Sequence, residues 1–387
     1  MVAPRDSPDH PGKSLIVGHG RHVRQFTVGW HVTERSEGRA TGAACEIEEK
    51  SNNHAAELGQ WAIADNALVS VDPMNLNHRA LLLCQDLLDN VQALRAVVQT
   101  SPGGGTIIDL GIAAPGGIEA GRRMAEICLA GLGHVSFSHP TLDFWRGPSV
   151  AVSTDHPVAA CMASQYAGWK LAAGKFFAMG SGPMRAAAGK EVLFDRIGCR
   201  ETTDAVVGVL ESRQLPPSDV IELIARDCGV QPAAVTLLVA PTASQAGTVQ
   251  IVARSIETAL HKLCELGFDL SRVESGWGVA PLPPVAGDDL AAIGRTNDAI
   301  LYGGEVTLWV RGDDASLEAI GPRIPSNASP DHGQPFREIF ERYDRDFYRV
   351  DPQLFSPATV TLANLDTGRC RRFGETMPEV LQRSFGT

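Results

Sequence analysis

The side chains best suited to chemistry gather in residues 239–270, VAPTASQAGTVQIVARSIETALHKLCELGFDL. On a helix of 3.6 residues per turn, Gln250, Arg254, Glu257 and His261 share one narrow stripe. Arg254 and Glu257 are three residues apart, so their side chains are close enough to touch. A carboxyl group beside a guanidinium, with an amide and an imidazole nearby, can position a water molecule and move a proton.

The same spacing also fits an ordinary amphipathic helix with an exposed ion pair, which contributes only about 0–1 kcal/mol. The spacing alone leaves both interpretations open. The preceding turn, PTASQAG, favours the chemical one, because small residues let a ligand approach a helix N-terminus closely.

The elements that must position these residues follow from the periodicity. We predict one continuous helix that begins near Ala246 or Gly247. Its buried arc consists of Val249, Val252, Ile256, Ala259, Leu260 and Leu263. The run AAVTLLVAP before it is typical of a buried strand.

Helices and strands are expected to alternate along the rest of the chain, which predicts an α/β or α+β class. Helical periodicity extends from Leu81 to Val98, and a strand follows the glycine turn after it. SRVESGWGVAPLPPV is expected to be loop, RTND a polar turn after a short helix, and SPATVTLANLDTGRCRRFG a strand pair. Residues 1–73 are polar without a sustained period, and we expect a poorly ordered extension there.

Composition narrows the function classes. The net charge of -11 argues against non-specific binding to nucleic acid or anionic membranes. The eight cysteines show no ligand spacing, so a zinc or iron–sulfur site is not expected, and buried free thiols fit a reducing cytosol. Neither an apolar run of about 18 residues nor a signal peptide is found.

Two small-residue turns carry further candidate binding groups. Gln165 and Tyr166 lie in SQYAGW, whose aromatic and hydrogen-bonding groups suit a flat heterocycle; an aromatic staple at a helix end is the alternative. Ser181 and Gly182, with Arg185, could hold a carboxylate or phosphate, although a plain strand-to-helix turn has the same composition.

A third polar set, Asn297, Asp298 and Tyr302, lies between apolar elements, where turn propensity explains part of it. His332, which precedes a helix, is more often structural than catalytic. Glycine fingerprints of dinucleotide and P-loop sites are absent from the sequence.

Taken together, long segments resemble the methenyltetrahydromethanopterin cyclohydrolase family. They are IEAGRRMAEICLAGLGHV, ASQYAGWKL, FFAMGSGPMRA, APTASQAGTVQIVARSIETALHKLCELGFDL, GRTNDAILYGG, DHGQPFREIF and DFYRVDPQLFSPA, in order from Met74 to Phe385. Residues 1–73 have no counterpart in the family pattern, and Met184 stands where a small residue is expected.

The resemblance implies two α/β domains with a deep pocket between them, in the fold particular to these cyclohydrolases. We place the first portion at residues 74–240 and the second at 241–387, with an approximate boundary and interleaved domains as the alternative. The catalytic pair implied is Glu257, as acid and base, with Arg254 orienting it. The substrate-binding residues implied are Gln165, Tyr166, Ser181, Gly182, Arg185, Ser244, Gln250, Asn297, Asp298 and Tyr302.

The implied reaction is the reversible hydrolysis of methenyl-tetrahydromethanopterin, or its dephospho form, to formyl-tetrahydromethanopterin in one-carbon metabolism. The resemblance implies a homotrimer with a pterin substrate and without metal or redox cofactor. Composition, as above, predicts a cytoplasmic protein without a nucleic-acid or membrane partner. Two alternatives stay open. One is another pterin or folate one-carbon enzyme, and the other is a non-catalytic pterin-binding protein.

Overall fold

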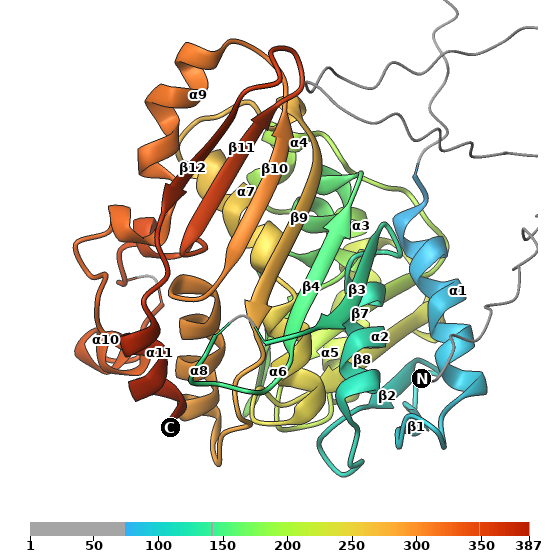
Figure 1. Cartoon of the computed structure of the whole chain (residues 1–387). Helices are drawn as coiled ribbons and strands as arrows, with labels where there is room; N and C mark the ends of the chain where they lie inside the picture. Colours follow the sequence, from blue (N-terminus) through green and yellow to red (C-terminus); the bar gives the residue numbers. More distant parts are fainter. Residues whose placement is uncertain (1–73, 141, 348, 387) are drawn as a thin grey trace, which may run out of the picture. The chain divides into compact units, whose positions relative to one another are not determined.

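The computed structural model describes residues 74–140, 142–347 and 349–386, and its strands form two six-stranded mixed sheets (Figure 1). The first sheet has the order β1-β2-β8-β7-β6-β5. Its strands are β1 (Val97–Thr100), β2 (Thr106–Asp109), β8 (Val235–Ala240), β7 (Val206–Glu211), β6 (Phe176–Ser181) and β5 (Trp169–Ala173). The three central strands β2, β8 and β7 are parallel, and antiparallel strands flank them on both sides.

The second sheet has the order β12-β11-β10-β9-β4-β3. Its strands are β12 (Cys370–Gly374), β11 (Thr359–Asn364), β10 (Glu305–Val310), β9 (Val273–Pro281), β4 (Ser149–Thr154) and β3 (Gly133–Ser138). Only β10 and β11 are parallel neighbours in this sheet. Because β3 and β4 come from the first half of the sequence, the chain visits the second sheet before it completes the first. The division at residue 240 stays a prediction.

Eleven α-helices and one π-helix occur among the described residues, together with short 3-10 turns. The α-helices are α1 (Leu76–Asp89), α2 (Ile118–Cys128), α3 (Met184–Ala188), α4 (Leu193–Ile197), α5 (Ser218–Cys228), α6 (Gln245–Val252), α7 (Ser255–Glu265), α8 (Asp289–Leu301), α9 (Asp314–Ile320), α10 (Phe336–Arg342) and α11 (Pro378–Phe385). The π-helix spans Val158–Gln165. No helix in the described part of the chain is both long enough and apolar enough to cross a membrane.

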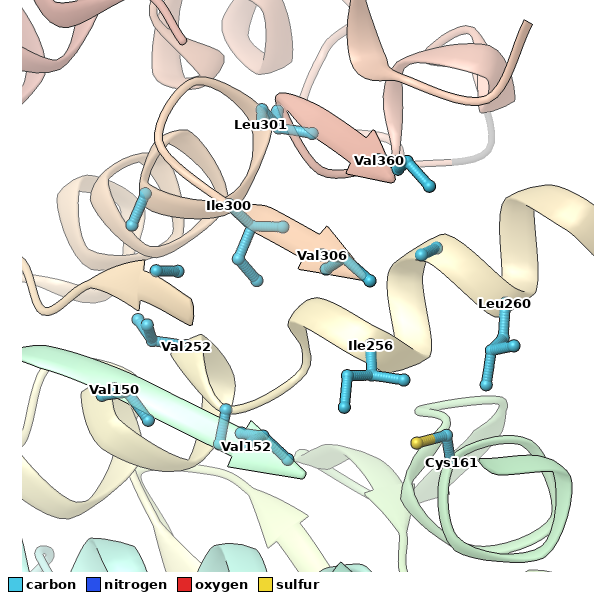
Figure 2. Packing of buried hydrophobic residues seen from close by; sticks show 14 of the residues in the cluster. Val150, Val152, Cys161, Val252, Ile256, Leu260, Ile300, Leu301, Val306 and Val360 are labelled. Atoms are coloured by element: carbon cyan, nitrogen blue, oxygen red, sulfur yellow. The ribbon is translucent and has the colours of Figure 1, made fainter. Parts of the chain in front are cut away.

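Helix α7 lies in the largest hydrophobic core, between the second sheet and the π-helix. Figure 2 shows Ile256 and Leu260 projecting from α7 toward Val152 of β4 and Cys161 of the π-helix. All four side chains are essentially inaccessible to solvent. The first turn of α7 is therefore fixed by packing on two sides.

The segment predicted as loop at SRVESGWGVAPLPPV is wrong: most of it forms β9, a central strand. Its glycines are turn-forming residues by composition, but here they admit a close neighbour. A Cβ at Gly278 would lie 2.5 Å from the Ser255 hydroxyl, and one at Gly276 would lie 2.9 Å from Ile256. The glycines allow the first turn of α7 to pack against the sheet.

The opening helix also differs from its prediction. Helical periodicity was expected to reach Val98, but α1 ends at Asp89, and β1 begins at Val97. Arg95 adopts a left-handed backbone with φ of 53°. Such a residue interrupts a right-handed helix, so the apolar residues beyond it join a sheet instead.

Candidate active site

The prediction of one continuous helix carrying Gln250, Arg254, Glu257 and His261 is wrong, because the structure has two helices with a turn at Ala253 and Arg254. The Arg254 N–H bonds the carbonyl of Ile251, three residues back, at 3.0 Å. The carbonyl of Ala253 accepts a hydrogen bond from Nε2 of Gln165 at 3.1 Å. A side chain from the π-helix thus bonds the backbone at the break.

This break changes the surroundings of the predicted catalytic pair, Arg254 and Glu257. Arg254 becomes the N-cap position of α7, and Glu257 lies in the first turn of that helix. Backbone N–H groups at a helix N-terminus favour a negative charge. The N-terminal position in α7 therefore favours the charged form of the Glu257 side chain.

The guanidinium of Arg254 is shared among several acceptors. Its Nη1 donates to the carbonyl of Gln165, and its Nη2 donates to the hydroxyl of Ser181 at 3.1 Å and to Oε1 of Gln250 at 3.1 Å. Nη2 also lies 3.5 Å from Oε1 of Glu211. The π-helix, β6, β7 and α6 thus all meet at this one side chain.

Glu257 stands farther from the guanidinium than these partners do. The closest approach, from Arg254 Nη1 to Oε2 of Glu257, is 3.8 Å, which is an ion pair without a hydrogen bond. Both side chains are only 6% exposed, so the exposed surface pair that the spacing also allowed is excluded. The pair is a buried one, where electrostatic effects are large.

Burial raises the pKa of the Glu257 carboxyl from 4.5 to about 7. The charges of Arg254 and Arg185 oppose this shift, and the negative charge of Glu211 adds to it. A carboxyl group with a pKa near neutrality can both accept and return a proton at physiological pH.

Arg254 and the residues around its guanidinium form what we call the Arg254 cluster: Gln165, Ser181, Glu211, Gln250, Arg254 and Glu257. Two buried polar atoms in this cluster have no hydrogen-bond partner among the described residues: Oε1 of Gln165 and Nε of Arg254. Gln165 is completely buried, and Arg254 is 5% exposed. Buried polar atoms in native proteins are nearly always paired with protein, water or ligand. An acceptor and a donor are therefore left for a bound water molecule or substrate.

Tyr166, which follows the π-helix, lies beside the pair. Its ring stacks on His261 with centroids 4.8 Å apart, and the guanidinium of Arg185 lies 5.0 Å from its centre. Tyr166 and His261 are partly exposed, whereas Arg185 is fully buried. The two stacked rings are thus a partly exposed aromatic surface next to the buried cluster.

Arg185 itself is occupied by protein groups. Nε and Nη2 donate to the carboxylate of Glu191 at 2.8 and 2.7 Å, and Nη1 donates to the carbonyl of Met162 at 2.9 Å. This network links the π-helix, through the Met162 carbonyl, to Glu191. Direct contact between Arg185 and a substrate stays a prediction.

Gly182 and Ser244 form hydrogen bonds with backbone groups near the cluster. Gly182 has a φ of +91°, a region that favours glycine, and its N–H bonds the Ser164 carbonyl at 2.8 Å. The hydroxyl of Ser244 caps α6 by accepting from the Gly247 N–H at 3.0 Å.

The polar turn predicted at RTND is wrong, because these residues belong to α8. Asn297 donates to the carbonyl of Ile293 one turn back, at 2.8 Å. This i to i−4 bond follows the helix, so turn propensity yields to the helical backbone. Asn297 and Asp298 both make hydrogen bonds within the fold.

Asp298 and Tyr302 tie α8 to the C-terminal segments. Asp298 accepts from the Phe336 N–H at 2.7 Å and from the Ser384 hydroxyl at 2.6 Å, and Tyr302 donates to the Gln334 carbonyl at 2.6 Å. Within the described residues, the hydrogen bonds of these two side chains go to residues 333, 334, 336 and 384, outside the Arg254 cluster. Their contact with a substrate stays a prediction.

Sequence reasoning missed Glu211. Its Oε1 accepts from Nε2 of Gln250 at 2.9 Å and lies beside Arg254. Glu211 is the last residue of β7 and pairs with Ala240 at the end of the parallel strand β8. Side chains at the carboxyl ends of parallel strands commonly form sites, so this position was the available signal.

A hollow of about 610 Å³ lies elsewhere, at one end of the second sheet. Its lining residues are Leu83, Glu126, Gly131, Leu132, Gly133, His134, Ser153, Thr154, Asp155, Ser275, Gly276, Trp277 and Trp309. None of them belongs to the Arg254 cluster. We place the chemistry at the cluster on its buried charges and unpaired atoms, and the deep interdomain pocket stays a prediction.

Comparison of the sequence with known proteins identifies one family. The family model described as Cyclohydrolase (MCH) matches residues 75–385. The chain is 49% identical over 305 residues to the methenyltetrahydromethanopterin cyclohydrolase of Methylobacillus flagellatus, covering 79% of this chain and 93% of that protein. The proteins of the same name from Xanthobacter autotrophicus and Methanosarcina barkeri are 51% and 42% identical over 305 and 322 residues, covering 79% and 82% of this chain and 90% and 99% of theirs.

Proposed function

The chain belongs to the methenyltetrahydromethanopterin cyclohydrolase family, and we propose that it hydrolyses the methenyl bridge of tetrahydromethanopterin or its dephospho form. The methenyl carbon joins two nitrogens in a delocalised cation. Water and this cation give the formyl compound and one proton, and the reaction is reversible. The enzyme is thus a hydrolase that opens a cyclic amidine C–N bond in one-carbon metabolism.

The observation that carries the proposed mechanism is the buried carboxyl of Glu257, whose burial raises its pKa to about 7. As the carboxylate, it takes a proton from water while the water oxygen bonds to the methenyl carbon. It then gives that proton to the departing nitrogen as the C–N bond breaks. The new hydroxyl loses its proton when the formyl C=O forms, so atoms and charge balance.

Arg254 has two roles in this proposal. It orients Glu257 from 3.8 Å and favours the charged carboxylate before water attack. The Glu257 anion, in turn, stabilises the bound methenyl cation. The unpaired Oε1 of Gln165 offers an acceptor for the attacking water, in line with its predicted substrate contact.

The rest of the predicted binding set stays part of this proposal. The half-buried ring of Tyr166, stacked on His261, suits the flat pterin ring. Ser181 and Gln250 lie in the cluster through Arg254. Gly182, Arg185, Ser244, Asn297, Asp298 and Tyr302 are carried over from the resemblance.

Assembly, cofactor use and location are proposed as well. The methenyl carbon is already electrophilic, so we expect neither metal nor redox cofactor. We propose a cytoplasmic homotrimer, a state that the resemblance implies. The described cysteines are free thiols, which suits a reducing compartment. Light scattering coupled to gel filtration tests the trimer, and fractionation of the source cells tests the location.

The experiment for the function follows the ultraviolet absorbance of the methenyl chromophore. Purified protein is mixed with methenyl-tetrahydromethanopterin or, in parallel, with methenyl-tetrahydrofolate, and the buffer rate is subtracted. We expect fast decay of the first compound only. Decay of the folate compound instead would favour the folate alternative, and binding without decay would favour a pterin-binding protein.

A further inference from the structure

Glu211 is the charged side chain beside the catalytic pair that the mechanism has not used. It lies at the end of β7, and its side chain is 20% exposed. Oε1 accepts from Nε2 of Gln250 at 2.9 Å and lies 3.5 Å from Nη2 of Arg254. The amide of Gln250 completes a triangle, since its Oε1 accepts from the same Nη2 at 3.1 Å.

This triangle divides the guanidinium of Arg254 into two sides. Nη2 is directed at Glu211, Gln250 and Ser181. Only Nη1 approaches Glu257, at a distance beyond a hydrogen bond, and the hydrogen bond that Nη1 does donate goes to the carbonyl of Gln165. A guanidinium beside a lone carboxylate frequently forms a bidentate pair with it. Here the Gln165 carbonyl competes for Nη1, and Glu211, Gln250 and Ser181 compete for Nη2.

We propose that Glu211 is a positioning residue, which together with Gln250 holds the Arg254 guanidinium so that it faces Glu257 without hydrogen bonding to its carboxylate. The inference rests on the function proposed above. Its consequence is chemical: Glu257 keeps a neighbouring positive charge but stays basic enough to take a proton from water. A bidentate pair would make Glu257 a weaker base.

The charge of Glu211 acts in the same direction as its geometry. The groups that face Glu257 from the surrounding elements are Arg254, Arg185, Glu211, Cys161 and Tyr166. Among them, the two arginines lower the pKa of Glu257, and Glu211 raises it. Loss of solvation raises the pKa of the buried Cys161 and of the half-buried Tyr166 above their ordinary values and keeps both neutral near pH 7.

The test is the pH profile of kcat/KM for methenyl-tetrahydromethanopterin in wild-type protein and the Glu211→Gln variant. Loss of the negative charge lowers the pKa of Glu257, and the released guanidinium can bond it. We expect the acidic limb to move about one pH unit lower and kcat to fall about threefold or more. The matched control is Glu222→Gln, an exposed glutamate on α5, which should reproduce the wild-type profile.

Two further variants keep the test decisive. Glu211→Asp retains the charge and should return the acidic limb toward the wild-type pH. Gln250→Leu removes the hydrogen bonds of the amide to Glu211 and Arg254 but keeps the charge of Glu211. It should shift the acidic limb in the same direction as Glu211→Gln, and it replaces that variant in the test if Glu211→Gln does not fold.

An acidic limb that stays at the wild-type pH while kcat falls would overturn the inference and reduce Glu211 to a structural bond. This outcome is separate from failure of the proposed function, in which wild-type protein itself would not accelerate decay of the chromophore. If Glu211→Gln cannot be measured, an acidic limb of Gln250→Leu that stays at the wild-type pH overturns the inference in the same way.

Discussion

Glu257 is the residue at which folding stability and the proposed proton transfer oppose each other. The residue is 5% exposed, and among the described residues its carboxylate forms one ion pair, with Arg254 at 3.8 Å. Burial raises its pKa because the charged form loses solvation that the nearby cations do not fully replace. A group tuned in this way makes the folded chain less stable at neutral pH, as functional sites commonly do.

The sign of this effect gives a prediction for Glu257→Gln. Below about pH 4.5 the carboxyl is protonated in both folded and unfolded chains. Between pH 4.5 and about 7 the unfolded chain loses the proton while the folded chain keeps it, so the free energy of unfolding falls as pH rises. The free energy of unfolding is lower by about 3 kcal/mol above pH 7. The Glu257→Gln variant has no titrating carboxyl there and does not lose this stability.

The melting temperature of Glu257→Gln, relative to wild type, should therefore increase from pH 4.5 to pH 8. Differential scanning calorimetry across this range measures it. Glu265→Gln, an exposed glutamate on the same helix, serves as control and should follow wild type at every pH. A difference between Glu257→Gln and wild type that is independent of pH would contradict the raised pKa.

At the residue scale, the sequence predicts the catalytic candidates but not their partners. Arg254 and Glu257 are visible because helical spacing is a local property. Glu211 is not, since its meeting with Gln250 depends on β7 lying beside β8, a contact between segments far apart in sequence. Asp298 lies in a polar set but is bound by Phe336 and Ser384, which spacing alone does not predict.

At the element scale, the turn between α6 and α7 is the feature that periodicity cannot predict. Residues 245–265 have helical periodicity throughout, so the sequence favours one helix. The hydrogen bond from Gln165 to the Ala253 carbonyl comes from a π-helix, and π-helical turns are frequent at functional sites. Tertiary bonding thus overrides a local preference at the site itself.

Helix α6 holds its place against α2 through a close backbone approach. A Cβ at Gly121 would lie 2.8 Å from both the Cα and the carbonyl oxygen of Ala246. Gly121→Ala should therefore force the helices apart, at a cost of about 1–3 kcal/mol. Because α6 carries Gln250, we also expect kcat to fall.

Thermal unfolding and steady-state kinetics measure both effects of Gly121→Ala. The control is Gly287→Ala, where an added Cβ meets no atom within 4 Å. Equal melting temperatures for the two variants would show that α2 and α6 accommodate the methyl group, which would contradict the close packing.

At the scale of the whole molecule, the alternation of strands and helices predicts the mixed class, and the two mixed sheets confirm it. It does not predict that β3 and β4 join the second sheet. Strand partners far apart in sequence follow from packing, and β9 was missed because its glycines are turn-forming by composition. The class is readable from the sequence, whereas the order of strands is not.

The family match begins at residue 75, and the contacts that define the site lie between residues 165 and 261. We therefore predict that a chain beginning at Met74 keeps the kcat, KM and melting temperature of the full chain. Residues 1–73 lie outside the described structure, so their expected poor order stays a prediction. A folded, truncated protein with a large loss of kcat would show that the extension contributes to the reaction.

The central claim is that Glu257 moves the proton. The most direct measurement is a single-turnover experiment on Glu257→Gln, with the methenyl chromophore followed after mixing with excess protein. The account predicts unchanged circular dichroism, retained pterin binding, and a chemical step slower by about 10²–10⁴-fold, the range typical of general acid–base groups. A rate within a few-fold of wild type would contradict it.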